Sequence, residues 1–187
     1  MMKHQLKFGL IAAAAIVMSI SACKKDKEVP EPEENELITK VSLKFTNTAN
    51  ATDIATVTWA DPDGDGGVAP TIGTLNLKAN TNYTFEVSEV LNETATDPAE
   101  RNILSEINEE ADEHLWVYTP AAGLNLTLVR TDRDKNNFPI GIKGTATAGA
   151  ISAGSLVVVL RHQPDVKNGT DTPGSTDFSA AIPVSIK

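Results

Sequence analysis

The sequence predicts an all-β protein: an antiparallel β-sandwich of the immunoglobulin-like, Greek-key kind with one inserted amphipathic helix. Three observations lead to this prediction. Short stretches of alternating apolar and polar residues recur between residues 37 and 187, turns rich in Gly, Asn, Asp and Pro separate them, and only one stretch has helical spacing. Strands do not alternate with helices, so a doubly wound parallel sheet is not expected.

The alternation is clearest in the first half of this region. Val41, Leu43 and Phe45 alternate with polar residues, which predicts a half-buried strand. The same reasoning predicts strands at residues 55–59, 75–77 and 83–87.

One helix is expected next. Asp97 can cap it, Pro98 stands where a missing N–H is harmless, and Glu100 completes a capping box. The residues expected on its buried face are Ile103, Leu104, Ile107 and Ala111. The residues expected to point toward solvent are Glu106, Glu109, Glu110 and Asp112.

Further strands are expected at residues 115–118, 124–128 and 140–142. Residues 156–160 are apolar throughout, which predicts a central strand covered on both faces. The last strand, at residues 182–186, contains Pro183, which predicts an edge position or a bulge.

Residues 1–22 have the features of a bacterial signal peptide. Lys3 and Lys7 precede an uncharged apolar stretch at residues 8–20. That stretch is too short for a permanent transmembrane helix, which needs about 20 apolar residues.

The stretch ends in Ile20, Ser21, Ala22 and Cys23, the pattern of a bacterial lipobox. It predicts cleavage between Ala22 and Cys23 and attachment of diacylglycerol and a further acyl chain such as palmitate to Cys23. Several acyl chains, at about 0.8 kcal/mol per buried methylene, anchor a protein stably. We therefore expect a lipoprotein of the cell envelope.

The residues after Cys23 bear on the location. Lys24, rather than Asp, follows the cysteine, which favours the outer membrane, with the domain facing the cell surface or the periplasm. Residues 24–28 resemble the charged export tags of surface lipoproteins. The acidic, Pro- and Glu-rich segment 23–36 is expected to be a disordered tether, and residues 37–187 the folded domain.

Charge and cysteine content exclude several functions. Without residues 1–22 the chain keeps 14 basic and 25 acidic residues, a formal charge of −11, which disfavours nucleic-acid binding. Because Cys23 is the only cysteine, its acylation leaves no thiol for a disulfide, a thiolate zinc site or a nucleophile.

The sharpest local motif is the loop at residues 61–67, which we call the Asp loop. Asp61, Asp63 and Asp65 stand at alternate positions among glycines, as in calcium-binding loops. A complete EF-hand is excluded because its twelfth position is Ile72, so the choice lies between a looser calcium site and a solvated turn.

Two histidines follow the predicted signal peptide. His114 is expected at a helix C-terminus, where a charged imidazole suits the helix dipole. His162 ends the most apolar strand and is a candidate ligand contact or a strand-end residue bonded to a loop. Because they are remote in sequence, no zinc centre is expected from them. No GxSxG or HExxH motif accompanies them, so no enzyme is expected.

Four stretches resemble those of small lipoproteins from Flavobacteria and their relatives in the Bacteroidota: residues 36–39, 61–67, 160–164 and 174–177. Such chains are sometimes assigned to a type 1 periplasmic-binding-fold superfamily. The resemblance spans nearly the whole chain and implies no catalytic residues. That label implies two α/β lobes, whereas the residue pattern predicts an all-β fold.

These observations predict a non-enzymatic envelope lipoprotein, anchored by its lipid, that binds a protein partner or a small ligand. The alternative is a calcium- or carbohydrate-binding β-sandwich module. A third hypothesis, a hydrolase, requires a cleft that joins His162 to an acid.

Overall fold

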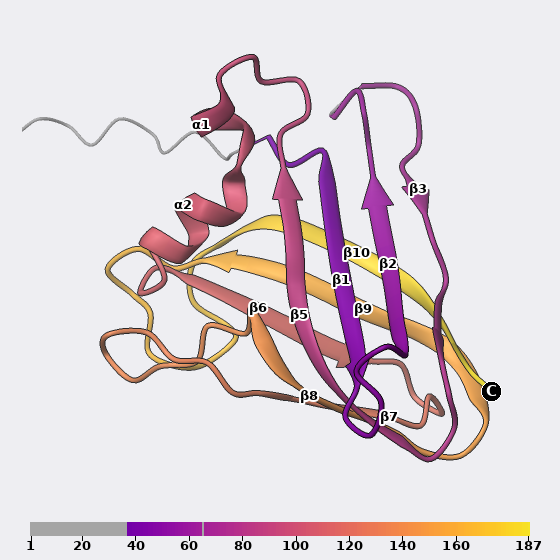
Figure 1. The fold of residues 1–187 in the computed structure, drawn as a ribbon. Helices are drawn as coiled ribbons and strands as arrows, with labels where there is room; N and C mark the ends of the chain where they lie inside the picture. Colours follow the sequence, from indigo (N-terminus) through magenta and orange to yellow (C-terminus); the bar gives the residue numbers. More distant parts are fainter. Residues whose placement is uncertain (1–36, 65) are drawn as a thin grey trace, which may run out of the picture. The chain divides into compact units, whose positions relative to one another are not determined.

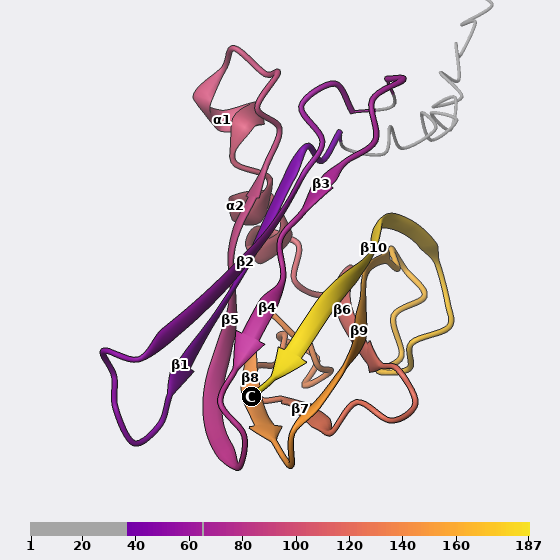
Figure 2. The same ribbon diagram turned by 90° about the vertical axis from the view of Figure 1, so that its right-hand side faces the viewer.

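The computed structural model describes residues 37–64 and 66–187, which belong to one compact unit, Glu34–Lys187. The predicted signal peptide, Cys23 and the tether lie outside the described residues. Two β-sheets pack face to face, with two short helices at one end (Figures 1 and 2). No helix of the described part is long and apolar enough to cross a membrane.

The larger sheet has six strands. They are β1 (Lys40–Asn47), β2 (Ile54–Ala60), β3 (Thr71–Ile72), β5 (Thr81–Leu91), β7 (Leu126–Arg130) and β8 (Lys143–Ala148). Their order is β3-β2-β1-β5-β8-β7, and all neighbours are antiparallel. Neighbours such as β1 and β5 are not consecutive in sequence, so the chain crosses between the sheets, as in Greek-key sandwiches.

The smaller sheet has four strands. They are β4 (Leu75–Leu77), β6 (His114–Pro120), β9 (Ser152–His162) and β10 (Ser175–Ile186). Their order is β4-β10-β9-β6. The pairing of β4 with β10 is parallel, an exception to the antiparallel pattern that the sequence predicts.

The core lies between the two sheets, where alternate residues of each strand meet. Aromatic rings join the layers: Phe85 contacts Tyr118 with centroids 5.0 Å apart, and Trp59 contacts Phe178 at 5.0 Å. Trp116 is fully buried. The all-β sandwich prediction is confirmed, and the described residues do not form the two α/β lobes of a type 1 binding fold.

The predicted single helix is two helices, α1 (Pro98–Arg101) and α2 (Ile103–Glu109). Asp97 caps α1 as predicted, since its carboxylate accepts from the Ala99 amide at 2.9 Å. The helix breaks at Asn102, whose φ of −98° and ψ of 72° are not helical. Ile103 and Ile107 are buried as predicted, and α2 packs against β5.

Two details of the strand predictions are wrong. Residues 140–142 precede β8 rather than forming a strand, and β8 itself consists of small residues with little hydrophobic signal. The strand at 156–160 is fully buried on one face only, since Val157 and Val159 are half-buried. Pro183 has an edge position as predicted: β10 pairs with β4 only from Val184 onward, so at Pro183 its one neighbour is β9.

Candidate functional site

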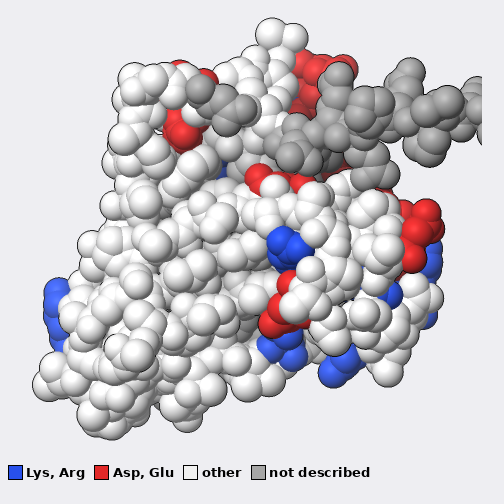
Figure 3. Space-filling view, turned by 180° about the vertical axis from the view of Figure 1, so that it is seen from behind, with Lys and Arg blue, Asp and Glu red and all other residues white. Residues whose placement is uncertain are grey.

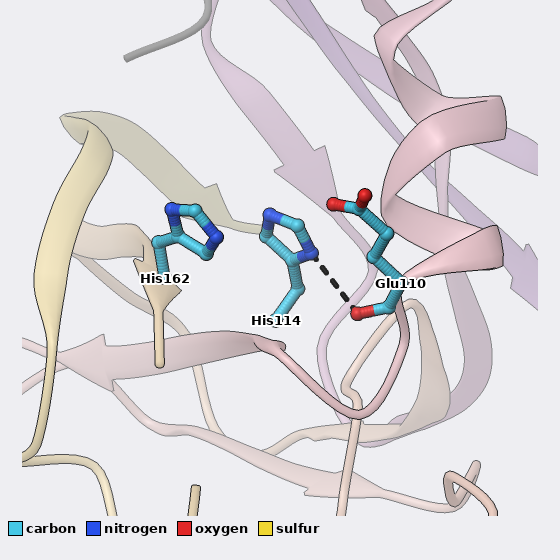
Figure 4. A group of neighbouring side chains, drawn as sticks. All are labelled: Glu110, His114 and His162. Carbon is cyan, nitrogen blue, oxygen red and sulfur yellow. Dashed lines mark hydrogen bonds between the residues drawn. The ribbon is translucent and has the colours of Figure 1, made fainter. Parts of the chain in front are cut away.

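The structure brings the two histidines together at one end of the sandwich. His114 begins β6 and His162 ends β9, and these residues are direct partners in the antiparallel register. Their rings stack with centroids 4.7 Å apart and an interplanar angle of 1° (Figure 4). The two histidines, remote in sequence, are therefore neighbours in the structure. We call this region, with Glu110, Glu113 and Asp177, the histidine end.

Glu110 completes a group of three possible metal ligands. One ligand atom from each of Glu110, His114 and His162 lies within 4.8 Å of the others. Figure 4 shows the Glu110 carboxylate beside the His114 ring. Glu110 is exposed as predicted, but it caps the C-terminus of α2 and turns its side chain toward the histidines instead of away from the sandwich.

His114 is held by the end of α2, as the sequence predicts. Its Nδ1 lies 3.1 Å from the backbone carbonyl oxygen of Glu110. A carbonyl can only accept a hydrogen bond, so Nδ1 carries the proton and Nε2 keeps its lone pair. Burial lowers the pKa of His114, so the ring is neutral at neutral pH, and the prediction of a charged imidazole is corrected.

Two more carboxylates border the rings. Glu113 Oε2 lies 3.8 Å from His162 Nε2, and Asp177 Oδ2 lies 3.9 Å from His114 Nε2. Asp177 stands at a bulge in β10, between Thr176 and Phe178. A bulge changes the direction of the side chain of its extra residue, which explains how β10 brings a buried carboxylate to this site.

The loop between β9 and β10 positions His162. The Arg161 guanidinium donates to the carbonyls of Thr172, Pro173 and Gly174, and the Gln163 amide donates to the Pro173 carbonyl at 2.9 Å. Two stretches of the family resemblance, residues 160–164 and 174–177, therefore lie side by side and build this end of the sheet.

A buried ion pair lies next to the histidine end. Lys167 Nζ contacts Asp134 Oδ2 at 2.8 Å, with both side chains almost fully buried. The same ammonium donates to the carbonyls of Ala111 and His114, at 2.7 and 2.8 Å. It thereby ties the end of α2 and the start of β6 to two loops.

The Asp loop is arranged differently. Asp61 is buried, whereas Asp63 is exposed and its carboxylate accepts from the Val68 amide at 3.2 Å. Gly64 adopts a left-handed φ of 60°, as the tight turn requires. Asp65 lies outside the described residues, so the calcium site stays a prediction.

The histidine end offers a neutral imidazole, a second imidazole and several carboxylates within a few ångströms. These are ligands for a divalent cation. The hydrolase hypothesis requires a cleft that joins His162 to an acid; an acid, Glu113, lies 3.8 Å from His162. Both tryptophans pack into the sandwich, so neither is an exposed platform for a sugar ring.

Sequence reasoning singled out His162 but missed Glu110, His114 and Asp177 as its neighbours. One signal was available: if strands 115–118 and 156–160 pair antiparallel, the histidines that flank them can face each other. Nothing in the sequence specified that pairing. Comparisons with protein families, with curated proteins and with solved structures found no match.

Proposed function

We propose that the protein is a non-enzymatic lipoprotein of the cell envelope whose sandwich domain binds a protein partner. The observation that carries this proposal is the outer face of the four-stranded sheet. Over most of β6, β9 and β10 its outward residues are uncharged: Val117, Thr119, Ser155, Val157, Val159, Ser179, Ala181 and Pro183. Arg161, near the end of β9, is charged, and its guanidinium donates to the loop between β9 and β10. We call this surface the uncharged face.

The uncharged face is unusual for this chain, in which 22% of residues are charged. Figure 3 shows the side of the molecule that carries the four-stranded sheet: a broad uncharged area on the left, with charged side chains near the middle of the view and on the right. The outer face of the six-stranded sheet, by contrast, carries Lys44, Glu86 and Lys143. Depletion of charge is the compositional mark of the core of a protein interface.

The N-terminal sequence supports the anchor. The lipobox ends in the only cysteine, Cys23, and the described domain begins at residue 37, a short distance beyond it. Attachment through Cys23 to the outer membrane, on its surface or periplasmic side, places the uncharged face within reach of other envelope proteins. The resemblance to Bacteroidota lipoproteins is consistent with this assignment.

Site-specific photocrosslinking in intact cells tests partner binding. A photoreactive residue in place of Val159 is expected to give one discrete adduct, and the same residue in place of Thr145 on the other sheet none. Ala181→Arg adds a charge to the uncharged face at an exposed position and should abolish the adduct, whereas Thr56→Arg on the opposite sheet should not. If the adduct still forms in the Ala181→Arg variant, the proposal that the uncharged face binds the partner is wrong.

Cell fractionation tests the anchor separately. Cys23→Ser removes the lipid acceptor, so the protein should move from the membrane fraction to the soluble fraction and lose labelling by radioactive palmitate. A variant that stays with the membrane would show that Cys23 is not the anchor.

A further inference from the structure

We propose that the histidine end is a binding site for a divalent transition-metal ion of the zinc class, with His114, His162 and Glu110 as ligands. The site is independent of the lipid anchor and of the uncharged face. It combines residues from three elements: the C-terminal cap of α2, the first residue of β6 and the last residue of β9.

The spacing fits an ion after a small movement. The three ligand atoms lie within 4.8 Å of one another. Two ligands of one tetrahedral zinc ion, each about 2.0–2.1 Å from the metal, are about 3.3 Å apart. The side chain of Glu110 is exposed and that of His162 is partly exposed, so both can close this difference while buried His114 stays in place. The His162 ring must tilt out of the stack to aim its lone pair at the ion.

His114 is prepared as a ligand. Its Nδ1 is occupied by the Glu110 carbonyl at 3.1 Å, which leaves the Nε2 lone pair for the metal. A hydrogen bond from the second ring nitrogen to a backbone carbonyl is the usual way in which proteins orient a metal-binding histidine.

The charges around the rings favour a cation. Glu110, Glu113 and Asp177 approach from α2, from the turn before β6 and from β10. Lys167 is paired with Asp134 at 2.8 Å, and the Arg161 guanidinium donates to the carbonyls of Thr172, Pro173 and Gly174. Asp177 Oδ2 lies 3.9 Å from His114 Nε2, a distance longer than a hydrogen bond.

The ligand set selects the class of metal. Imidazole nitrogen suits zinc, copper and nickel, whereas calcium and magnesium prefer sites built from oxygen ligands alone. A metal ion at this site would link α2 to β6 and β9 of the smaller sheet.

Titration calorimetry with Zn²⁺ alone tests the proposal. The full chain, purified in detergent with a tag that contains no histidine, carries His4→Gln so that only His114 and His162 remain. We expect one Zn²⁺ per chain and, with Co²⁺, the visible absorption of a four-coordinate site. His162→Ala and Glu110→Gln should each weaken Zn²⁺ binding on the order of tenfold or more.

Glu109→Gln is the matched control, because Glu109 is an exposed neighbour outside the ligand group, and its Zn²⁺ affinity should be unchanged. Circular dichroism of His162→Ala checks that the sandwich is intact. Absence of one-to-one binding, or equal affinity in His162→Ala and the unsubstituted chain, would overturn the proposal. Since the assay uses neither membrane nor partner, that failure would leave the proposed function standing.

Discussion

The Asp loop and the histidine end are both candidate cation sites, and they are built in opposite ways. The Asp loop draws its side chains from one run of seven residues, and its hydrogen bonds are local. The Gly66 amide donates to the Asp63 carbonyl, and the amide of Val68, the residue after the loop, donates to the Asp63 carboxylate. The histidine end draws Glu110, His162 and Asp177 from elements far apart in the sequence. The side chains of the histidine end are brought together only by the tertiary fold. We therefore expect substitutions there to change the stability of the whole domain more than substitutions in the Asp loop.

The largest expected effect is on the ion pair below the histidine end. Lys167→Met leaves the buried Asp134 carboxylate without its cation, which should cost about 3–5 kcal/mol of unfolding free energy in urea denaturation. Lys135→Met is the matched control. Its ammonium is 72% exposed in its pair with Asp112, so the cost should be about 1 kcal/mol or less. An equal loss of unfolding free energy in the two variants would show that the buried ion pair does not stabilise the histidine end.

Glycine substitutions come next. Gly174 has a φ of 81°, and an added Cβ would lie 1.9 Å from the His162 carbonyl oxygen. Gly174→Ala should therefore cost about 2 kcal/mol or more and disturb His162. In the Asp loop, an added Cβ at Gly67 meets nothing within 4 Å, and Gly67→Ala should change stability by about 0.5 kcal/mol at most. Thermal unfolding of both variants measures the difference, and a tolerated Gly174→Ala would contradict it.

Tyr118 lies on β6, the strand that begins with His114, and it gives the next prediction. Burial raises the pKa of Tyr118 well above its ordinary value, and its hydroxyl donates to the Gly141 carbonyl at 2.7 Å. The unfolded chain releases this proton near pH 10, whereas the folded protein retains it, so stability should fall above about pH 10 by up to about 1.4 kcal/mol per unit.

Tyr118→Phe should cost about 1 kcal/mol at neutral pH and reduce this alkaline loss. Urea denaturation at about pH 8 and about pH 11 measures both effects. A variant with the same alkaline slope as the unsubstituted protein would show that Tyr118 is not the group responsible.

The smallest expected effect is that of calcium on the Asp loop. Because Asp63 is exposed and already accepts from a backbone amide, millimolar calcium should leave the melting temperature unchanged, whereas a small excess of zinc should raise it. A rise with calcium that Asp63→Asn removes would instead support the calcium-binding module.

Much of the fold could be predicted because its signals are local. The alternation of Val41, Leu43 and Phe45 marks β1, since the side-chain period of a strand is two. The Asp97 cap and the buried face of α2 could be predicted in the same way. β8 could not be predicted, because its alternation is between small residues. The break at Asn102 could not be predicted either, because no proline or glycine marks it.

By itself, the sequence determined the all-β class, the positions of most strands, the acidic charge and the candidate lipidation site at Cys23, because each depends on residues close together in the chain. Tertiary structure alone decided which strands pair. The antiparallel register of β6 and β9 places His114 against His162, and the β10 bulge directs Asp177 toward them. Pairing depends on how two sheets bury their apolar faces together, and no short stretch of sequence contains that information.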